Sequence, residues 1–155
     1  MMTIKIKIQS LTELRRLAQA LEKSLGGSKT VIALTGELGA GKTTFAKFFL
    51  RAAGIKKRIT SPTFVLMHQY KKSGKNYFHL DLYRTKNFRE IEALGITEAW
   101  HHSKNIFLIE WAEKIQRHLP KTAVQIKFKV RPNHRDLQIL NLPPKIAKIL
   151  SPLYN

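Results

Sequence analysis

The sequence contains no cysteine, no long apolar run and few acidic residues, and the first two shortages each exclude a class of protein. Without cysteine the chain forms no disulfide, no zinc–thiolate site and no thiolate nucleophile. No apolar stretch approaches the roughly 18–20 residues that a membrane span requires. The first ten residues alternate lysine with isoleucine and lack the continuous apolar core of a signal peptide. We therefore expect a soluble cytoplasmic protein with no membrane partner.

The shortage of acids gives the chain a large positive charge. Only 10 Asp and Glu oppose 28 Lys and Arg, so the formal net charge is +18 over 155 residues. Residues 38–80 hold nine Lys or Arg and no acid, and residues 121–150 hold seven against the single acid Asp136. Such a field attracts nucleic acid, anionic membrane or acidic protein alike, and lysines dispersed over a solvated surface give the same composition. Charge alone therefore selects no partner.

Strand-like and helix-like patterns alternate along the chain, and the length suits one domain over residues 1–155. Alternating or wholly apolar stretches predict strands over 3–9, 31–34, 64–70, 76–81, 105–110, 123–130 and 136–141. Amphipathic patterns predict helices over 10–25, about 43–53, 88–94, 111–119 and a short stretch after residue 143. The first of these helices opens on Ser10 and Glu13 at capping-box spacing. This alternation predicts an α/β fold with a mixed parallel and antiparallel central sheet.

A phosphate-binding loop separates the apolar strand over 31–34 from the helix that follows. Residues 36–43, with the sequence GELGAGKT, match G-x-x-x-x-G-K-[ST]. Its glycines let successive N–H groups turn around phosphate oxygens, and the helix N-terminus adds partial positive charge. We expect Lys42 to reach the β- and γ-phosphates and the Thr43 hydroxyl to ligate Mg²⁺. The motif thus predicts ATP and Mg²⁺ as cofactors and a P-loop NTPase-like three-layer fold.

Hydrolysis of a bound nucleotide also requires a carboxylate near the metal. Glu110 ends the apolar strand over 105–110, which is the position of a Walker B acid. Asp81 likewise follows a strand-like stretch, and His79 shares its strand face. His79 either helps to fix the Asp81 carboxylate or packs in the core. Further along, Arg84 either contacts a partner or phosphate or pairs with the acidic helix over 88–94.

Four motifs, in their order and spacing, resemble the TsaE family of small bacterial ATPases. They are GELGAGKTT at 36–44, SPTF at 61–64, HLDLYR at 79–84 and IEWAE at 109–113. The resemblance covers about residues 10–120 and implies a role in tRNA threonylcarbamoyladenosine (t6A) synthesis. TsaE-like proteins act with a TsaB–TsaD pair, which transfers a threonylcarbamoyl group to adenosine 37 of tRNA. The resemblance implies contacts with TsaD-like and TsaB-like proteins, with tRNA reached through the complex, and a weak ATPase that partners activate.

The resemblance also implies roles for single residues. It puts Thr63 in a switch-like segment near the γ-phosphate and metal, gives Asp81 to the metal or the attacking water, and makes Glu110 the Walker B-like acid. Lys42, Asp81 and Glu110 are then the catalytic residues, and Thr43, Asp81 and Glu110 the Mg²⁺ ligands. Relatives usually carry threonine where Leu14 stands, near the expected nucleotide base. The residues expected to bind the cofactor are Glu37, Leu38, Gly39, Ala40, Gly41, Lys42, Thr43, Thr44 and Thr63.

Two other functions share parts of this pattern. A small P-loop kinase has the same loop but needs an acceptor pocket and usually an Arg-rich lid, and residues 84–104 are short and poor in arginine. A basic RNA-binding module with a nucleotide site is favoured by the charge alone. A GTPase is disfavoured because the chain contains no N-K-x-D guanine-reading motif.

Overall fold

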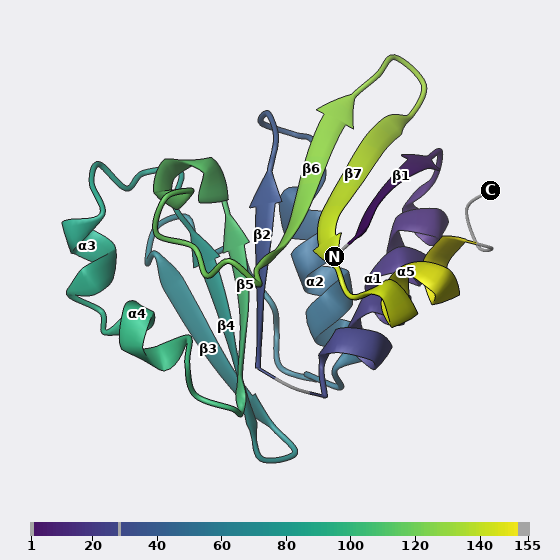
Figure 1. Cartoon of the computed structure of the whole chain (residues 1–155). Coiled ribbons are helices and arrows are strands. Elements are labelled where there is room, and N and C mark those ends of the chain that lie inside the picture. Colours follow the sequence, from purple (N-terminus) through teal and green to yellow (C-terminus); the bar gives the residue numbers. More distant parts are fainter. Residues whose placement is uncertain (1, 28, 152–155) are drawn as a thin grey trace.

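A mixed β-sheet forms the centre of the computed structural model, which describes residues 2–27 and 29–151 (Figure 1). The strands are β1 (Met2–Ile8), β2 (Thr30–Thr35), β3 (Met67–Lys72), β4 (Lys75–Asp81), β5 (Asn105–Glu110), β6 (Val124–Val130) and β7 (Arg135–Leu142). The helices are α1 (Leu11–Leu25), α2 (Lys42–Ala52), α3 (Arg89–Glu92), α4 (Ile96–Ala99) and α5 (Pro144–Leu150), with a 3₁₀ turn η1 (Ala112–Ile115).

The strand order places a parallel centre between antiparallel edges. In the described residues the sheet has seven strands in the order β1-β7-β6-β2-β5-β4-β3. β2 pairs in parallel with β5 and β6, and β4 pairs in parallel with β5. Because parallel strands point the same way, β2, β4 and β5 end at one edge of the sheet. The sequence-based prediction of an α/β fold with a mixed sheet is therefore confirmed.

The two faces of the sheet are covered unequally. Helices α1, α2 and α5 pack on one face, where they share a core with residues of β1, β2, β5, β6 and β7. On the other face a second core joins α3, α4 and η1 to β2, β4 and β5. No described residue of β1, β6 or β7 belongs to that second core. The predicted three layers are thus present over the parallel centre, whereas β1, β6 and β7 carry helices on one face.

Helix α1 begins as its sequence predicts. The Ser10 hydroxyl accepts a hydrogen bond from the Glu13 N–H at 3.2 Å, and the Glu13 carboxylate accepts one from the Gln9 N–H at 2.7 Å. The first bond satisfies an N–H group that the first helical turn leaves without a partner, and the second ties the residue before the N-cap to the helix. The predicted apolar stripe is buried and consists of Leu14, Leu17, Ala18, Leu21 and Leu25.

The strand predicted over 64–70 is wrong in its first three residues, because β3 starts at Met67. The Val65 N–H donates to the Pro62 carbonyl at 3.1 Å in a turn, and Leu66 has a left-handed φ of 68°. Phe64 and Val65 are 80% and 60% exposed. Their strand-forming side chains therefore find no neighbouring strand or core to pack against, and strand propensity without such packing is weak.

Two predicted helices are shorter than their sequence patterns suggest. The predicted helix over 111–119 is wrong, because the left-handed φ of 57° at Trp111 precedes a 3₁₀ turn of four residues, η1. The helix predicted over 88–94 is only α3, and Gly95, with a φ of 66°, separates it from α4, which the pattern did not predict. The sequence pattern therefore located helical structure in this region but not the bounds of its turns.

Candidate functional site

The loop between β2 and α2 requires glycine at two points. Gly36 has a φ of 137°, and a Cβ atom there would lie 2.6 Å from the carbonyl oxygen of Phe128 in β6. Gly41 has a φ of 108° at the N-cap of α2, and no side chain caps that helix. The first N–H groups of α2 therefore lie open toward the loop, and an anion would satisfy them. A phosphate group fits this cradle.

The Lys42 side chain binds the backbone of its own loop. Its Nζ donates to the carbonyl oxygens of Gly36 at 2.5 Å and Glu37 at 2.9 Å, and it lies 3.9 Å from the centroid of the Trp111 ring. The side chain is buried, and loss of hydration lowers the pKa of Lys42 from its ordinary value. Four nearby carboxylates oppose this fall, with Glu113 the strongest of them. A cation with little water around it is an effective phosphate ligand.

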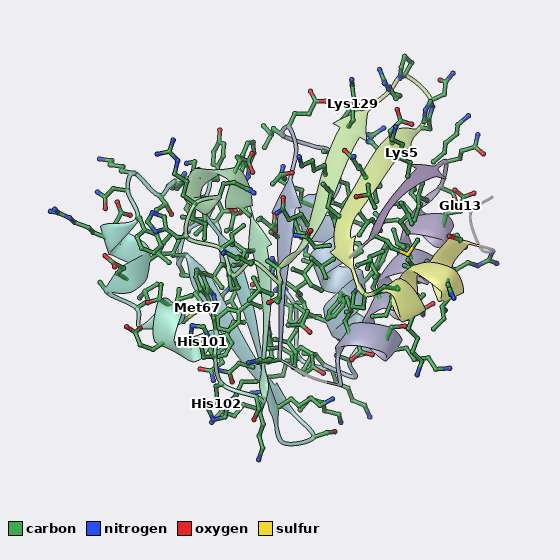
Figure 2. All side chains as sticks on the ribbon, in the orientation of Figure 1. Lys5, Glu13, Met67, His101, His102 and Lys129 are labelled. Carbon is green, nitrogen blue, oxygen red and sulfur yellow. The ribbon has the colours of Figure 1, made fainter. Side chains whose placement is uncertain are left out.

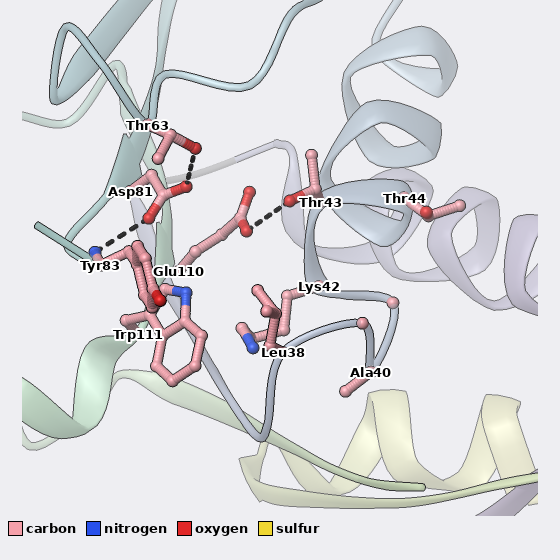
Figure 3. Close-up of a pocket in the computed structure, with 12 residues that line it drawn as sticks. Leu38, Ala40, Lys42, Thr43, Thr44, Thr63, Asp81, Tyr83, Glu110 and Trp111 are labelled. Atoms are coloured by element: carbon pink, nitrogen blue, oxygen red, sulfur yellow. Dashed lines mark hydrogen bonds between the residues drawn. The ribbon is translucent and has the colours of Figure 1, made fainter.

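Glu110 stands at the end of β5 with both carboxylate oxygens bonded. Thr43 donates its hydroxyl to Oε2 at 2.6 Å, and His79 Nε2 lies 2.7 Å from Oε1 (Figure 3 shows the first contact). Glu110 and His79 are 2% and 0% exposed, so the contact between them is shielded from water. Sequence analysis left two alternatives for His79, fixing the Asp81 carboxylate or packing in the core. Among the described residues its ring is fully buried, and its hydrogen-bonding partner is Glu110, so the structure favours the core position.

Asp81 stands beside Glu110 because the two residues are register partners at the ends of β4 and β5. Its Oδ2 accepts a hydrogen bond from the Thr63 hydroxyl at 2.6 Å, and its Oδ1 accepts one from the Tyr83 N–H at 2.9 Å (Figure 3). Ser61 donates more weakly to the same Oδ2 at 3.4 Å. Residues 61–63 are thereby tied to the sheet through one carboxylate.

A pocket of about 270 Å³ brings these groups together (Figure 3). It contains every sequence-predicted site residue except Glu37 and adds two aromatic residues. The lining residues are Leu38, Gly39, Ala40, Gly41, Lys42, Thr43, Thr44, Thr63, Asp81, Tyr83, Glu110 and Trp111.

Glu37 lies outside that pocket and serves the loop instead. Its carbonyl accepts from Lys42, and its carboxylate accepts from the Val130 N–H at 3.4 Å, which fastens the loop to β6. The rings of Tyr83 and Trp111 have centroids 5.0 Å apart. Both residues belong to the motifs at 79–84 and 109–113, and that membership was the signal available, but the sequence did not predict that they line the pocket.

A second hollow of about 290 Å³ adjoins the first across the loop. The two share Gly39, Ala40, Gly41 and Thr44, so one loop borders both. Leu14 of α1 lines the second hollow and gives it an apolar wall. The position of a nucleotide base near Leu14 stays a prediction. Asn133, His134 and Arg135 line the opposite side.

The acidic groups fit a magnesium ion that phosphate oxygens help to hold. Across the described residues, no group of three or more His, Cys, Asp or Glu side chains could hold a metal. Magnesium in nucleotide sites takes one or two carboxylates, phosphate oxygens and water. Thr43, Asp81 and Glu110 offer a hydroxyl and two carboxylates at one end of the pocket.

No helix among residues 2–27 and 29–151 is long and apolar enough to cross a bilayer.

Among the described residues, Arg84 forms no ion pair with the acidic helix α3, and its contact with a partner or phosphate stays a prediction. Its guanidinium lies over the Phe64 ring, with Cζ 4.2 Å from the centroid. This cation–π contact joins the end of the 79–84 motif to the exposed turn of the 61–64 motif. Arg84 therefore stands outside the residues that line the pocket.

Comparisons with known proteins converge on one family. A family model described as threonylcarbamoyl adenosine biosynthesis protein TsaE matches residues 8–137. The tRNA threonylcarbamoyladenosine biosynthesis protein TsaE of Haemophilus influenzae is 32% identical over 126 residues, covering 81% of this chain and 79% of its own. The TsaE protein of Rickettsia conorii is 37% identical over 131 residues, covering 84% and 73%. The crystal structure of YdiB from Bacillus subtilis matches with a TM-score of 0.75 and 26% identity, over 98% of this chain and 96% of that one.

A double-mutant cycle tests the buried contact between His79 and Glu110. Replacing His79 by Ala leaves a buried carboxylate oxygen without its partner, so we expect a loss of roughly 1–3 kcal/mol in the free energy of unfolding. In the Glu110→Gln background this loss should shrink, giving a coupling energy of about 1 kcal/mol or more. Urea unfolding of the four proteins measures it.

The matched control for this cycle pairs His79→Ala with Asp81→Asn. Asp81 lies on the same strand, and in the described residues its carboxylate bonds to Ser61, Thr63 and Tyr83, not to His79. We expect a coupling energy below about 0.5 kcal/mol for that pair. Equal coupling to both acids, or stronger coupling to Asp81, would contradict the assigned contact.

Proposed function

The chain belongs to the TsaE family of threonylcarbamoyl adenosine biosynthesis proteins, and we propose that it is the ATP-binding and ATP-hydrolysing component of this tRNA modification machinery. It acts in the cytoplasm beside a TsaB–TsaD pair and supports their catalytic cycle. The observation that carries the proposal is the pocket in which Lys42 and Thr43 of the loop meet Asp81 and Glu110 of the sheet.

The loop residues supply the binding of the phosphates. The open N–H groups at the start of α2 and the Lys42 ammonium offset their negative charge, and burial strengthens both interactions. To bind phosphate, Lys42 exchanges the carbonyl oxygens of its own loop for phosphate oxygens. A bound Mg²⁺ would neutralise charge on the phosphates. Thr43, Glu110 and Asp81 would hold that ion.

The second hollow suits the nucleoside. It continues from the loop, is walled by Leu14 and is open to polar groups of residues 133–135. An apolar wall with a few polar groups is typical of a base-binding pocket. ATP would therefore lie across the loop, with its base toward α1 and its terminal phosphate toward Thr63 and Asp81.

The pocket explains why we expect slow hydrolysis by the isolated chain. Among its described lining residues, Lys42 is the one cation. Charge that develops on the transferred phosphoryl group in related reactions is stabilised by an added arginine, which accelerates them about 10³–10⁵-fold. Arg84 lies on Phe64 instead. A TsaD-like or TsaB-like partner can complete the site, either with its own cation or by moving the segment that holds Arg84.

Reconstitution tests the proposed function. ATP hydrolysis by the purified chain should be slow, should rise when a TsaB–TsaD pair and tRNA are added, and should accompany t6A formation. Lys42→Ala removes the ammonium that faces the phosphates, so hydrolysis and t6A formation should both be lost, with ATP affinity lowered by about tenfold or more. Phosphate release, mass spectrometry of tRNA digests and calorimetric titration give the three readouts.

The outcomes of the reconstitution separate the proposed function from its alternatives. ATP binding without any response to the TsaB–TsaD pair would contradict the pathway role and retain the nucleotide site. Phosphoryl transfer stimulated by a small-molecule acceptor would instead identify a kinase. Lys72→Ala, on the far strand β3, is the control and should leave all three readouts within about twofold.

Asp81→Asn tests the division of labour in the pocket. The amide keeps the shape of the side chain but removes the negative charge that would face metal and water. We expect ATP affinity within about threefold of the wild type and hydrolysis with the TsaB–TsaD pair reduced by about 10²-fold or more. Asp136→Asn, on β7, is the matched control. Parallel losses of ATP affinity and thermal stability in Asp81→Asn would show that Asp81 is structural.

A further inference from the structure

The uncovered face of β1, β7 and β6 is lined by lysine. Along β1 and β6, isoleucine, valine and phenylalanine point into the helix-covered core, so the alternate residues point outward. Figure 2 labels Lys5 and Lys129 in the part of the molecule that contains β1, β6 and β7. We call this surface the lysine face, and its exposed cations are Lys5, Lys7, Lys127, Lys129 and Arg131.

The strand register arranges these cations in two rows. Lys5 and Lys127 both pair with Gln138 of β7, from opposite sides, and Lys7 and Lys129 both pair with Asp136. Successive outward residues on a strand are about 6.7 Å apart, and strands are about 4.8 Å apart. The Cα atoms of the four lysines therefore lie at the corners of a patch about 7 Å by 10 Å, a spacing that lets one polyanion contact all four side chains.

Little negative charge opposes this patch. Asp136 is the one acid among the described residues that line the hollow over the lysine face. Its carboxylate accepts a hydrogen bond from Arg131 Nε at 2.6 Å and lies 3.0 Å from His134 Nε2. Asp136 is therefore already neutralised by its own neighbours, and the hydrogen bond from Arg131 lowers its pKa. The four lysines remain available to an external anion.

The hollow over the lysine face has a volume of about 680 Å³ and offers charge without an apolar centre. None of the exposed large hydrophobic residues of the described chain lines it, and its one aromatic residue, Phe128, is buried. A protein partner favours an interface with an apolar or aromatic core, and a membrane surface favours apolar groups that insert. Without exposed rings, bases would find no stacking partner. The lysine face thus matches a sugar–phosphate backbone.

The lysine face also adjoins the nucleotide loop. Val130, directly after Lys129, donates its N–H to the Glu37 carboxylate, and the Phe128 carbonyl lies against Gly36. A polyanion bound along β6 would therefore lie beside the loop that carries Lys42.

We infer that the lysine face binds the phosphate backbone of folded RNA, with tRNA as its natural ligand. The inference rests on the proposed function for the identity of that RNA, whereas the contact itself depends only on the four lysines. It gives part of the +18 charge a role and makes the contact with tRNA direct. Recognition is of charge and shape, so we expect little preference for sequence.

Fluorescence anisotropy with a labelled, folded tRNA transcript tests the inference without any partner protein. Four phosphate contacts predict a slope of log affinity against log salt of roughly −3. Lys127→Gln/Lys129→Gln should weaken binding by about tenfold or more near 0.1 M salt and bring the slope to about −1.5. Lys5→Gln/Lys7→Gln, on the other side of β7, should have a similar effect, so one poorly folded variant cannot decide the result.

Lys145→Gln/Lys148→Gln is the matched control, because it removes the same charge from α5, on the opposite face of the sheet. It should change the affinity for tRNA by less than about threefold. Equal effects of all three double variants would show a general response to net charge and would overturn the inference. So would equal competition by poly-glutamate or by vesicles containing phosphatidylserine, which would indicate an acidic protein or a membrane.

ATP titration of the same variants keeps this test separate from the proposed function. Loss of tRNA binding with unchanged ATP affinity supports the lysine face whatever the reconstitution shows. Wild-type tRNA binding in both lysine-face variants contradicts the face and leaves the ATPase proposal intact.

Discussion

The parallel pairing of β4 with β5 is the constraint on which the rest of the site depends. It makes Asp81 and Glu110 register partners at the ends of neighbouring strands. The pairing of β2 with β5 then brings the loop after β2 to the same edge, where Thr43 reaches Glu110. A shift of β4 by one residue would turn Asp81 to the opposite face and separate the two carboxylates. The backbone hydrogen bonds that define the sheet therefore also set the positions of the two carboxylates and the loop.

Much of this arrangement can be predicted from the sequence, because its local patterns are strong. The loop over 36–43 combines a residue motif with a preceding apolar strand, and Glu110 ends a second apolar strand, β5. The contacts between motifs are different. Strand order and turn geometry determine three of these contacts. They are His79 with Glu110, Lys42 with the Trp111 ring, and Arg84 with the Phe64 ring. A single sequence does not contain that order.

The unequal covering of the sheet explains where the positive charge gathers. Two cores enclose the parallel centre, so its strands are apolar on both faces. β1, β6 and β7 need apolar residues on one face alone, and their other face is free to carry lysine. β6 belongs to both regions, since it pairs with β2 and also fastens Glu37 of the loop. β6 thus carries lysines of the lysine face and also contacts the loop that borders the pocket.

The most direct test of the account is a crystal structure of the chain with Mg²⁺ and a non-hydrolysable ATP analogue. The account predicts phosphates cradled by residues 36–43, Lys42 on the terminal phosphates, and a metal held by Thr43 and at least one of Asp81 and Glu110. The base should lie against Leu14. A nucleotide bound away from the loop would contradict it. So would a metal that Thr43 does not hold, or a metal held by neither Asp81 nor Glu110.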